Sequence, residues 1–302
     1  MGRRVLITGL SSFWGGRVAQ AFEADPDVEV IVGLDTKDPE VPLDRTEFVR
    51  ADQTYSILSR IVKATAVDTV LHTFLTVDST RVSGRALHEQ NVIGTMNLLA
   101  ASGSPGSSVR QVIVKSSTLV YGSSWQDPTW FREEMPRVNP PRSRVERSLV
   151  EVESYLRDFT EDNPHVTVTL LRFANVLGTD IVTPISRALQ LPLVPCILGF
   201  DPLLQFVEED DVVRSIEFVT RRRLPPELLD LLRFGRGVDN RRLKATGFEY
   251  RYTSAGAVQS FARATRLQRT IGTRAPYRYE HGVEQFFRHS PAIVRNPEGT
   301  TT

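Results

Sequence analysis

The residues best placed to do chemistry in this chain form a short glycine-containing loop near its start. Gly9, Ser12 and Gly15 are spaced three apart in the run Thr-Gly-Leu-Ser-Ser-Phe-Trp-Gly-Gly, between an apolar stretch and a helical pattern. The first glycine permits a tight turn, and the last lets the following helix pack closely on a sheet. The N-terminus of that helix would offer free N–H groups to a pyrophosphate, with Phe13 and Trp14 just before it as candidate contacts. A serine in the middle costs some closeness of approach, although its hydroxyl can donate a hydrogen bond.

A carboxylate follows where a ribose-binding group would be expected. Asp35 ends the second apolar stretch of the chain, about 20 residues beyond the loop. A carboxylate there can accept hydrogen bonds from both hydroxyls of an adenosine ribose, and it would repel a 2′-phosphate. The two features together predict a nicotinamide dinucleotide site that favours NAD over NADP. The alternative is a structural turn followed by a solvated aspartate.

Strands and helices alternate around these residues. Apolar, β-branched runs predict strands at residues 3–8, 28–34, 47–50, 68–72, 109–115 and 166–172. Apolar residues at helical spacing predict helices at 15–24, 55–64, 86–102 and 143–159. This alternation predicts an α/β fold of the Rossmann type, a doubly wound parallel sheet with right-handed crossovers.

The pattern becomes less regular after about residue 175. Prolines at positions 184, 192, 195 and 202 break the chain into short segments, and the acidic run 208–211 predicts the start of a helix that ends near Val219. We therefore expect a dinucleotide-binding domain over residues 1–175. Residues 176–294 should mix elements of a small substrate cap with returning sheet and helix elements, and 295–302 should form a disordered tail.

The composition is that of an ordinary globular protein and excludes several classes. No apolar run reaches the ~18 residues that cross a bilayer, so no membrane span is expected. Cys196 is the only cysteine and the five histidines are scattered, so neither a disulfide nor a metal site is expected. The chain enters its first strand without the apolar region of a signal peptide, which predicts a cytoplasmic protein.

A net charge of +1 hides an asymmetry along the chain. Residues 1–220 carry 21 Lys and Arg against 29 Asp and Glu, a net of −8, whereas residues 221–302 carry 16 against 7, a net of +9. A basic C-terminal part could hold an anionic ligand such as a diphosphate, or contact nucleic acid or anionic lipid. A solvated arginine-rich face explains the charge equally well.

Motifs spread over residues 3–215 resemble those of the extended short-chain dehydrogenase/reductases, in particular the NAD-dependent epimerase/dehydratase family of nucleotide-sugar enzymes. Besides the loop and Asp35, they are Ala51-Asp52, Val70-Leu-His-Thr-Phe74, Asn91-Val-Ile-Gly-Thr-Met-Asn97, Val114-Lys-Ser-Ser-Thr-Leu-Val-Tyr-Gly122 and Arg172-Phe-Ala-Asn-Val-Leu-Gly178. The resemblance implies further dinucleotide contacts from Asp52, Gln53, Phe74, Asn91 and Ser116. More narrowly, the chain resembles an actinobacterial branch of epimerase-like proteins whose phosphate loop also lacks the middle glycine.

The resemblance also implies a catalytic hydroxyl. In the family, a Ser or Thr and the Tyr of a Tyr-x-x-x-Lys pair bracket a substrate hydroxyl or carbonyl. The Tyr transfers the proton, and the Lys binds the nicotinamide ribose and lowers the pKa of the phenol. Counting back from Tyr121-Gly122, the family's hydroxyl falls on Ser117.

The Tyr-x-x-x-Lys pair itself is missing. If the following Leu149-Val-Glu151 is the anchor, Ser143 takes the Tyr position and Arg147 the Lys position. A serine hydroxyl is far too weak an acid to replace a phenol with a pKa of about 10. A guanidinium keeps the positive charge but does not release a proton. We therefore expect altered or absent proton transfer at this site.

The C-terminal part departs from the family as well. The family's Tyr/Phe-Asn-Val/Ile-Gly strand is missing after the helix that ends near Val219, where the chain runs directly into Arg221-Arg-Arg-Leu-Pro-Pro. The later run from Gly237 to Gly247-Phe resembles the family's closing element. We therefore expect a truncated cap and a more open substrate pocket.

Two functions fit these observations. One is an NAD-dependent epimerase, dehydratase or reductase that acts on a nucleotide-linked sugar or a similar small molecule. The other is a non-catalytic NAD(H)-binding sensor or scaffold protein. In a third reading, Ser12, Phe13 and Trp14 close the loop to any dinucleotide. By resemblance, helices 86–102 and 143–159 form a homodimer interface, although burial against the sheet explains their apolar stripes equally well.

Overall fold

The central element is a six-stranded sheet, seen in a computed structural model that describes residues 2–78, 82–194, 199, 203–221 and 244–271, with residues 287, 290, 291, 293 and 294 near the carboxyl end. Its strands are β1 (Arg3–Thr8), β2 (Val28–Asp35), β3 (Glu47–Arg50), β4 (Thr69–His72), β5 (Gln111–Ser117) and β6 (Thr167–Phe173). All are parallel, in the order β3-β2-β1-β4-β5-β6. The predicted Rossmann-type sheet is therefore confirmed.

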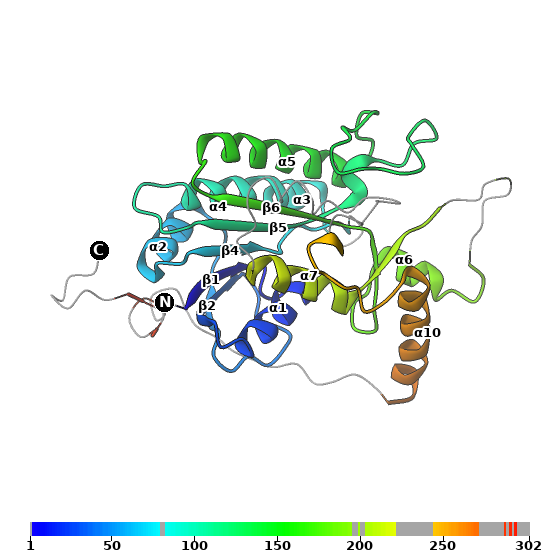
Figure 1. The fold of residues 1–302 in the computed structure, drawn as a ribbon, viewed down its shortest axis with the longest axis horizontal. Helices are drawn as coiled ribbons and strands as arrows, with labels where there is room; N and C mark the ends of the chain where they lie inside the picture. Colours follow the sequence, from blue (N-terminus) through cyan, green and yellow to red (C-terminus); the bar gives the residue numbers. More distant parts are fainter. Residues whose placement is uncertain are drawn as a thin grey trace.

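Helices cover both faces of this sheet (Figure 1). One face carries α2 (Tyr55–Thr65), α3 (Gly84–His88), α4 (Gly94–Ser102) and α5 (Arg144–Asp162), and the other carries α1 (Phe13–Glu23) and α7 (Glu209–Arg221). Two buried apolar clusters fill the layers, because alternate side chains of each strand point to opposite faces. Val112 and Val114 belong to the first cluster, and Ile113 between them belongs to the second.

The single helix expected over residues 86–102 consists of three consecutive pieces. A π-helical turn (Glu89–Ile93) joins α3 to α4. Turns of this kind are rare and often mark functional sites. This one contains Asn91, whose side chain is fully buried.

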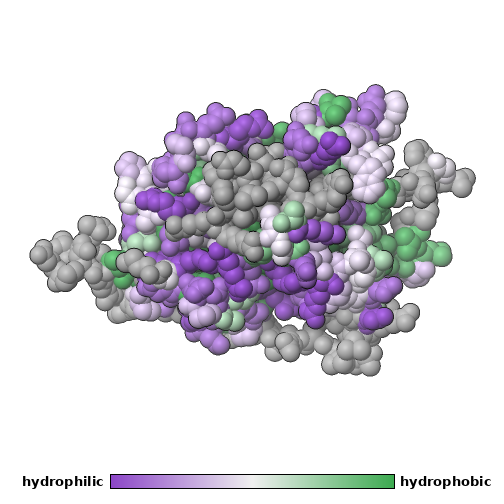
Figure 2. All heavy atoms as spheres, viewed as in Figure 1, coloured by the Kyte–Doolittle hydropathy of each residue, from purple (hydrophilic) through white to green (hydrophobic). Residues whose placement is uncertain are grey.

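A smaller group of elements lies beyond the carboxyl ends of β5 and β6. A two-stranded parallel sheet pairs β7 (Asn175–Leu177) with β8 (Phe206–Glu208), and α6 (Pro184–Leu189) and α10 (Ser254–Ile271) lie beside it (Figure 1). Apolar surface gathers at this end of the molecule, whereas polar residues cover most of the remaining visible face (Figure 2). The expected tail, the basic run after Arg221 and the missing cap strand lie outside the described residues.

None of the helices that the structure describes is long and apolar enough to cross a membrane.

Candidate functional site

The glycine-containing loop joins β1 to α1 at the point where the strand order reverses, since β1 pairs with both β2 and β4. Ligands of doubly wound sheets bind in the crevice at such a point. Gly9 has a φ of +82°, and a Cβ there would lie 2.9 Å from the backbone of Phe74. A Cβ on Gly15 would lie 2.1 Å from the carbonyl oxygen of Gly9. Both glycines are therefore required by the close approach of backbone to backbone.

The serine in the middle of the loop is the N-cap of α1. Ser12 has φ −70° and ψ 154°, so its Cβ causes no backbone strain. Its Oγ accepts a hydrogen bond from the amide of Gly15 at 3.1 Å and donates one to the carbonyl of Gly9 at 2.6 Å. In the described part of the chain, the amides of Phe13 and Trp14 are the first-turn donors left over, at the positive end of the helix dipole.

Asp35 lies directly beside this loop. It is 4% exposed at the carboxyl end of β2. Its Oδ2 accepts a hydrogen bond from the amide of Ser11 at 3.0 Å, and its Oδ1 accepts one from the amide of Thr36 at 2.7 Å. The carboxylate is therefore held in a fixed orientation where the loop and the second strand meet.

A buried side-chain amide just after β3 lacks hydrogen-bond partners among the described residues. Asp52 is exposed, and its Oδ1 accepts a weak hydrogen bond from the amide of Thr54 at 3.4 Å. The side-chain oxygen and nitrogen of Gln53 are both buried and have no hydrogen-bond partner among the described residues. A buried amide without partners is costly and usually signals a ligand or an ordered water. A heterocyclic base with a hydrogen-bonding edge fits this place.

The side chain of Asn91 forms hydrogen bonds to other parts of the protein. Its Oδ1 accepts from the amide of Thr76 at 2.8 Å, and its Nδ2 donates to the carbonyl of Thr76 at 2.9 Å and to Oγ of Ser148 at 3.1 Å. It thereby fixes the segment after β4, which contains the half-buried Phe74. A direct contact of Asn91 with a dinucleotide therefore stays a prediction.

His72 is a fully buried, neutral histidine at the end of β4. Its Nδ1 lies 2.6 Å from Oγ1 of Thr8, and its Nε2 lies 3.0 Å from Oγ1 of Thr95. Burial, with a smaller effect from Lys115, lowers the pKa of His72 from 6.5 to about 3. The neutral ring joins β1, β4 and α4 below the site.

We expect His72 to make folding stability depend on pH in the acid range. Above pH 6.5 the ring is neutral in both states and contributes no dependence. Between pH 6.5 and about 3 the unfolded chain binds a proton that the folded state excludes. The free energy of unfolding should therefore decrease as the pH is lowered through this range, by up to about 1.4 kcal/mol per pH unit.

Urea unfolding at a series of pH values measures this dependence. His72→Gln removes the titration and should flatten the curve relative to the native chain. His165→Gln, at an exposed position, is the matched control and should leave the slope unchanged. Identical slopes for all three proteins would contradict the assignment.

A cavity of about 410 Å³ lies between the carboxyl ends of β5 and β6, the start of α1 and α6. Ser116 and Ser117 both line it. Oγ of Ser117 accepts from the amide of Leu119 at 3.3 Å, whereas Oγ of Ser116 donates to Oε1 of Glu153 on α5, also at 3.3 Å. The hydroxyl of Ser116 is thus engaged with α5, and that of Ser117 can donate to a ligand.

The structure does not bring Ser143 and Arg147 together with Ser117. Ser143 is the exposed N-cap of α5 and forms a capping box with Glu146, whose amide donates to Oγ of Ser143 at 3.1 Å. Arg147 is exposed, and neither residue lines the cavity. The inward-facing pair at the same four-residue spacing is Val145 and Leu149, both in the apolar core. A catalytic role for Ser143 or Arg147 stays a prediction without support from this geometry.

The structure adds a residue that the motif comparison passed over. Lys115 lies two residues before Ser117 on β5, is 4% exposed and lines the same cavity. Its Nζ lies 5.4 Å from the ring centroid of Trp14. Burial lowers its pKa to about 8. The available signal was a lysine directly after the apolar run 112–114 near the carboxyl end of β5.

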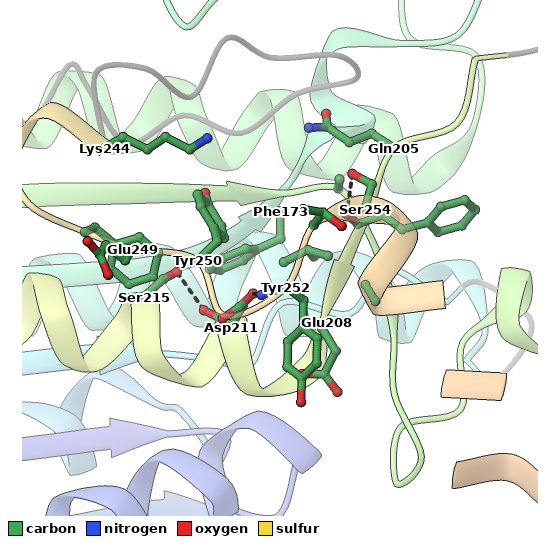
Figure 3. Close-up of a pocket in the computed structure, with 16 residues that line it drawn as sticks. Phe173, Gln205, Glu208, Asp211, Ser215, Lys244, Glu249, Tyr250, Tyr252 and Ser254 are labelled. Atoms are coloured by element: carbon green, nitrogen blue, oxygen red, sulfur yellow. Dashed lines mark hydrogen bonds between the residues drawn. The ribbon is translucent and has the colours of Figure 1, made fainter. Parts of the chain in front are cut away.

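A second cavity, of about 640 Å³, adjoins the first, because Phe173 and Ala174 line both. Figure 3 shows Tyr250 and Tyr252, from the segment before α10, beside Asp211 of α7. Burial raises the pKa of Glu208, on β8, to about 7. The two cavities together offer room for an extended ligand beneath the smaller group of elements.

Comparison with known proteins gives a consistent picture. A model of the NAD-dependent epimerase/dehydratase family matches residues 5–223. The chain is 36% identical over 218 residues to an uncharacterized protein of Mycobacterium tuberculosis, a match that covers 70% of this chain and 58% of that protein. The match therefore spans less than two thirds of that relative's length.

Solved structures share the fold. The dTDP-glucose 4,6-dehydratase DesIV of Streptomyces venezuelae, with NAD bound, superposes with a TM-score of 0.66 at 21% identity, covering 88% of this chain and 98% of that one. A UDP-glucose 4-epimerase of Thermotoga maritima, with UDP-glucose, has a TM-score of 0.66 at 18% identity, covering 88% and 99%. At such low identity this likeness establishes the fold.

Proposed function

This chain belongs to the NAD-dependent epimerase/dehydratase family, and we propose that it binds NAD along the carboxyl edge of its sheet and acts on a nucleotide-linked sugar. The observation that carries the proposal is the buried Asp35 carboxylate, held beside the free amides at the start of α1. The amides of Phe13 and Trp14 would hold the pyrophosphate, Asp35 the adenosine ribose, and Gln53 the adenine edge. When bound, NAD supplies a hydride acceptor.

The substrate would lie in the two adjoining cavities. Ser117 would donate a hydrogen bond to the reacting oxygen of the sugar from the wall of the smaller cavity. The larger cavity would hold the nucleotide end. Both the DesIV dehydratase and the Thermotoga maritima epimerase are named for substrates of this class.

The second candidate is a non-catalytic NAD(H)-binding sensor or scaffold protein. The observation in its favour is α5, which presents Val145 and Leu149 to the core and exposes Arg147. Hydride transfer from UDP-glucose to bound NAD, followed as NADH absorbance, separates the two, because only a catalyst oxidises the sugar alcohol and reduces the dinucleotide.

Two further features of the proposal concern the whole protein. We infer a homodimer through α4 and α5, where the exposed Met96 lines a shallow groove of about 330 Å³; Ile93, in the π-helical turn before α4, is exposed as well. We also place the protein in the cytoplasm, in keeping with its single cysteine.

Asp35→Ala tests the dinucleotide assignment. It should weaken NAD binding by about 10–100-fold, because hydrogen bonds to a charged acceptor contribute about 1.5–3 kcal/mol. The preference for NAD over NADP should narrow as well, because the repulsion of a 2′-phosphate is removed. Calorimetric titration with both dinucleotides measures the two effects.

The matched control is Asp38→Ala, which removes a nearby carboxylate paired with Arg50 and should leave both affinities within about twofold. A loop that is merely loosened would lose both dinucleotides equally. Unchanged NAD affinity in Asp35→Ala would show that the ribose assignment is wrong.

A further inference from the structure

Lys115 and Ser117 face the same space. They stand two residues apart on β5, so their side chains leave the same face of the sheet. That face is the one covered by α1, and both residues line the cavity of about 410 Å³. The amine of Lys115 therefore approaches the cavity beside the hydroxyl of Ser117.

The cavity offers very little proton-transfer chemistry apart from this amine. Among the described residues that line it, Lys115 is the one with an ionisable side chain; the others are apolar, hydroxyl or amide residues. Lys115 also interacts electrostatically with His72 on β4, which stays neutral near physiological pH. The helix that would carry a Tyr-x-x-x-Lys pair presents Val145 and Leu149 to the core instead.

A purely structural role for Lys115 would lower the stability of the fold. Its side chain is buried, its Nζ lies 5.4 Å from the centroid of the Trp14 ring, and none of the ion pairs found among the described residues includes it. Burying an amine without an opposite charge costs free energy, and a methionine would fill a similar volume at lower cost. Such a residue is expected where its amine meets a ligand.

We propose that Lys115 is the general base and acid of this site, a role that rests on the NAD-dependent function proposed above. A substrate alcohol held by Ser117 gives its hydroxyl proton to the neutral Lys115 amine and its carbon-bound hydride to the oxidised nicotinamide dinucleotide, so that the carbon–oxygen bond becomes a carbonyl. In the reverse direction, the Lys115 ammonium returns the proton to the carbonyl oxygen as the hydride comes back.

The protonation behaviour of Lys115 fits this role. Burial lowers its pKa to about 8, so both the amine and the ammonium are populated near neutral pH. Proton transfer is most effective when the pKa of the group lies near the operating pH, and it contributes about 10²–10⁴-fold to the rate. A guanidinium at this position would not release its proton.

Lysine NMR tests the placement without relying on activity. The chain has four lysines, so a protein labelled with [ε-¹³C]lysine gives four Cε signals, and Lys115→Met identifies the one of interest. Its pKa should be about 8 in the free protein. In the NAD complex it should be lower than in the NADH complex, because the oxidised nicotinamide ring carries a positive charge that disfavours the ammonium. An equal pKa in the two complexes would overturn the proposal.

A second measurement tests the chemistry. UDP-glucose is added to wild-type protein loaded with NAD. The reduction of the bound NAD is followed as NADH absorbance over a range of pH. Lys115→Met should keep NAD affinity within about threefold and slow this reduction by about 10²–10⁴-fold. Lys115→Arg should be equally slow, although its charge is retained. The matched control, Lys63→Met at an exposed position on α2, should leave both the rate and the Lys115 signal unchanged.

The outcomes separate the two proposals. If neither dinucleotide binds by calorimetry, the proposed function fails. If both bind and the Lys115 signal does not distinguish them, or if Lys115→Met reduces NAD at the wild-type rate, only the role of Lys115 fails. If wild-type protein does not react with UDP-glucose, the NMR comparison alone decides.

Discussion

Replacing Glu153 with leucine should lower the free energy of unfolding by about 3–5 kcal/mol, because it leaves the guanidinium of Arg172 buried without its counter-ion. Nε of Arg172 donates to Oε1 of Glu153 at 2.8 Å, and Nη2 donates to Oε2. Nη1 donates to the hydroxyl of Tyr121 at 2.7 Å. The pair joins α5 to β6, and through the hydroxyl of Ser116 it also holds the end of β5 that carries the candidate site.

Chemical denaturation of the single and double variants measures this contribution. Glu153→Leu combined with Arg172→Met removes both charges and should recover most of the loss, since an apolar pair of similar volume replaces a buried ion pair at little cost. The matched surface variant Glu89→Ala, which breaks the exposed pair with Arg85, should cost less than about 0.5 kcal/mol. A loss below about 1 kcal/mol for Glu153→Leu would contradict the structure.

Gly15→Ala should destabilise the fold by about 3 kcal/mol and remove measurable NAD binding. The added Cβ would lie 2.1 Å from the carbonyl oxygen of Gly9 and 2.7 Å from Cα of Leu10, both backbone atoms. Relief requires α1 to move away from β1, and overpacking of this kind costs about 1–3 kcal/mol or more. The same movement takes the amides of Phe13 and Trp14 away from the pyrophosphate position.

The next residue provides the control. A Cβ on Gly16 would meet Cγ2 of Val41 at 2.7 Å, the end of a side chain that can rotate away. Gly16→Ala should therefore cost less and keep NAD binding, although it lies on the same helix turn. Thermal unfolding and calorimetry with NAD compare the two variants. Equal effects at both positions would show that the close packing of α1 on the sheet is not what Gly15 provides.

The phosphate loop and the sheet could be predicted because their signals are local. Six apolar runs in the sequence predict the six buried strands of the sheet. The loop between the first strand and the first helix contains Gly9 and Gly15 where two backbone segments approach too closely for a Cβ. Ser12, which looked like a defect in the loop, is the N-cap of α1 with an ordinary φ. The Asp35 carboxylate could be located in the same way, because the end of a strand defines where its last side chain lies.

Which face of α5 packs against the sheet could not be predicted as reliably from the sequence. An anchor on Leu149-Val-Glu151 puts Ser143 and Arg147 at the catalytic positions, and that assignment stays a prediction. The structure shows both residues exposed, and two residues along a helix separate a core-facing side chain from a solvent-facing one. Burial against the sheet, together with the contact of Ser148 with Asn91, decides that Val145 and Leu149 face inward. Those contacts join segments more than 50 residues apart.

The sequence by itself therefore determined the alternation of strands and helices, the position of the glycine-containing loop, the position of the Asp35 carboxylate and the absence of a Tyr-x-x-x-Lys pair, because periodicity and spacing are properties of short segments. The order of the strands in the sheet came from the structure. Only the tertiary structure decided which side chains reach the cavity. In the sequence, Lys115 is one charged residue after a short apolar run. In the structure, Trp14 of α1 lies over its amine, and it lines the same cavity as Ser117. The physical reason is that burial, and with it the lowered pKa of an amine, depends on every element packed around the group.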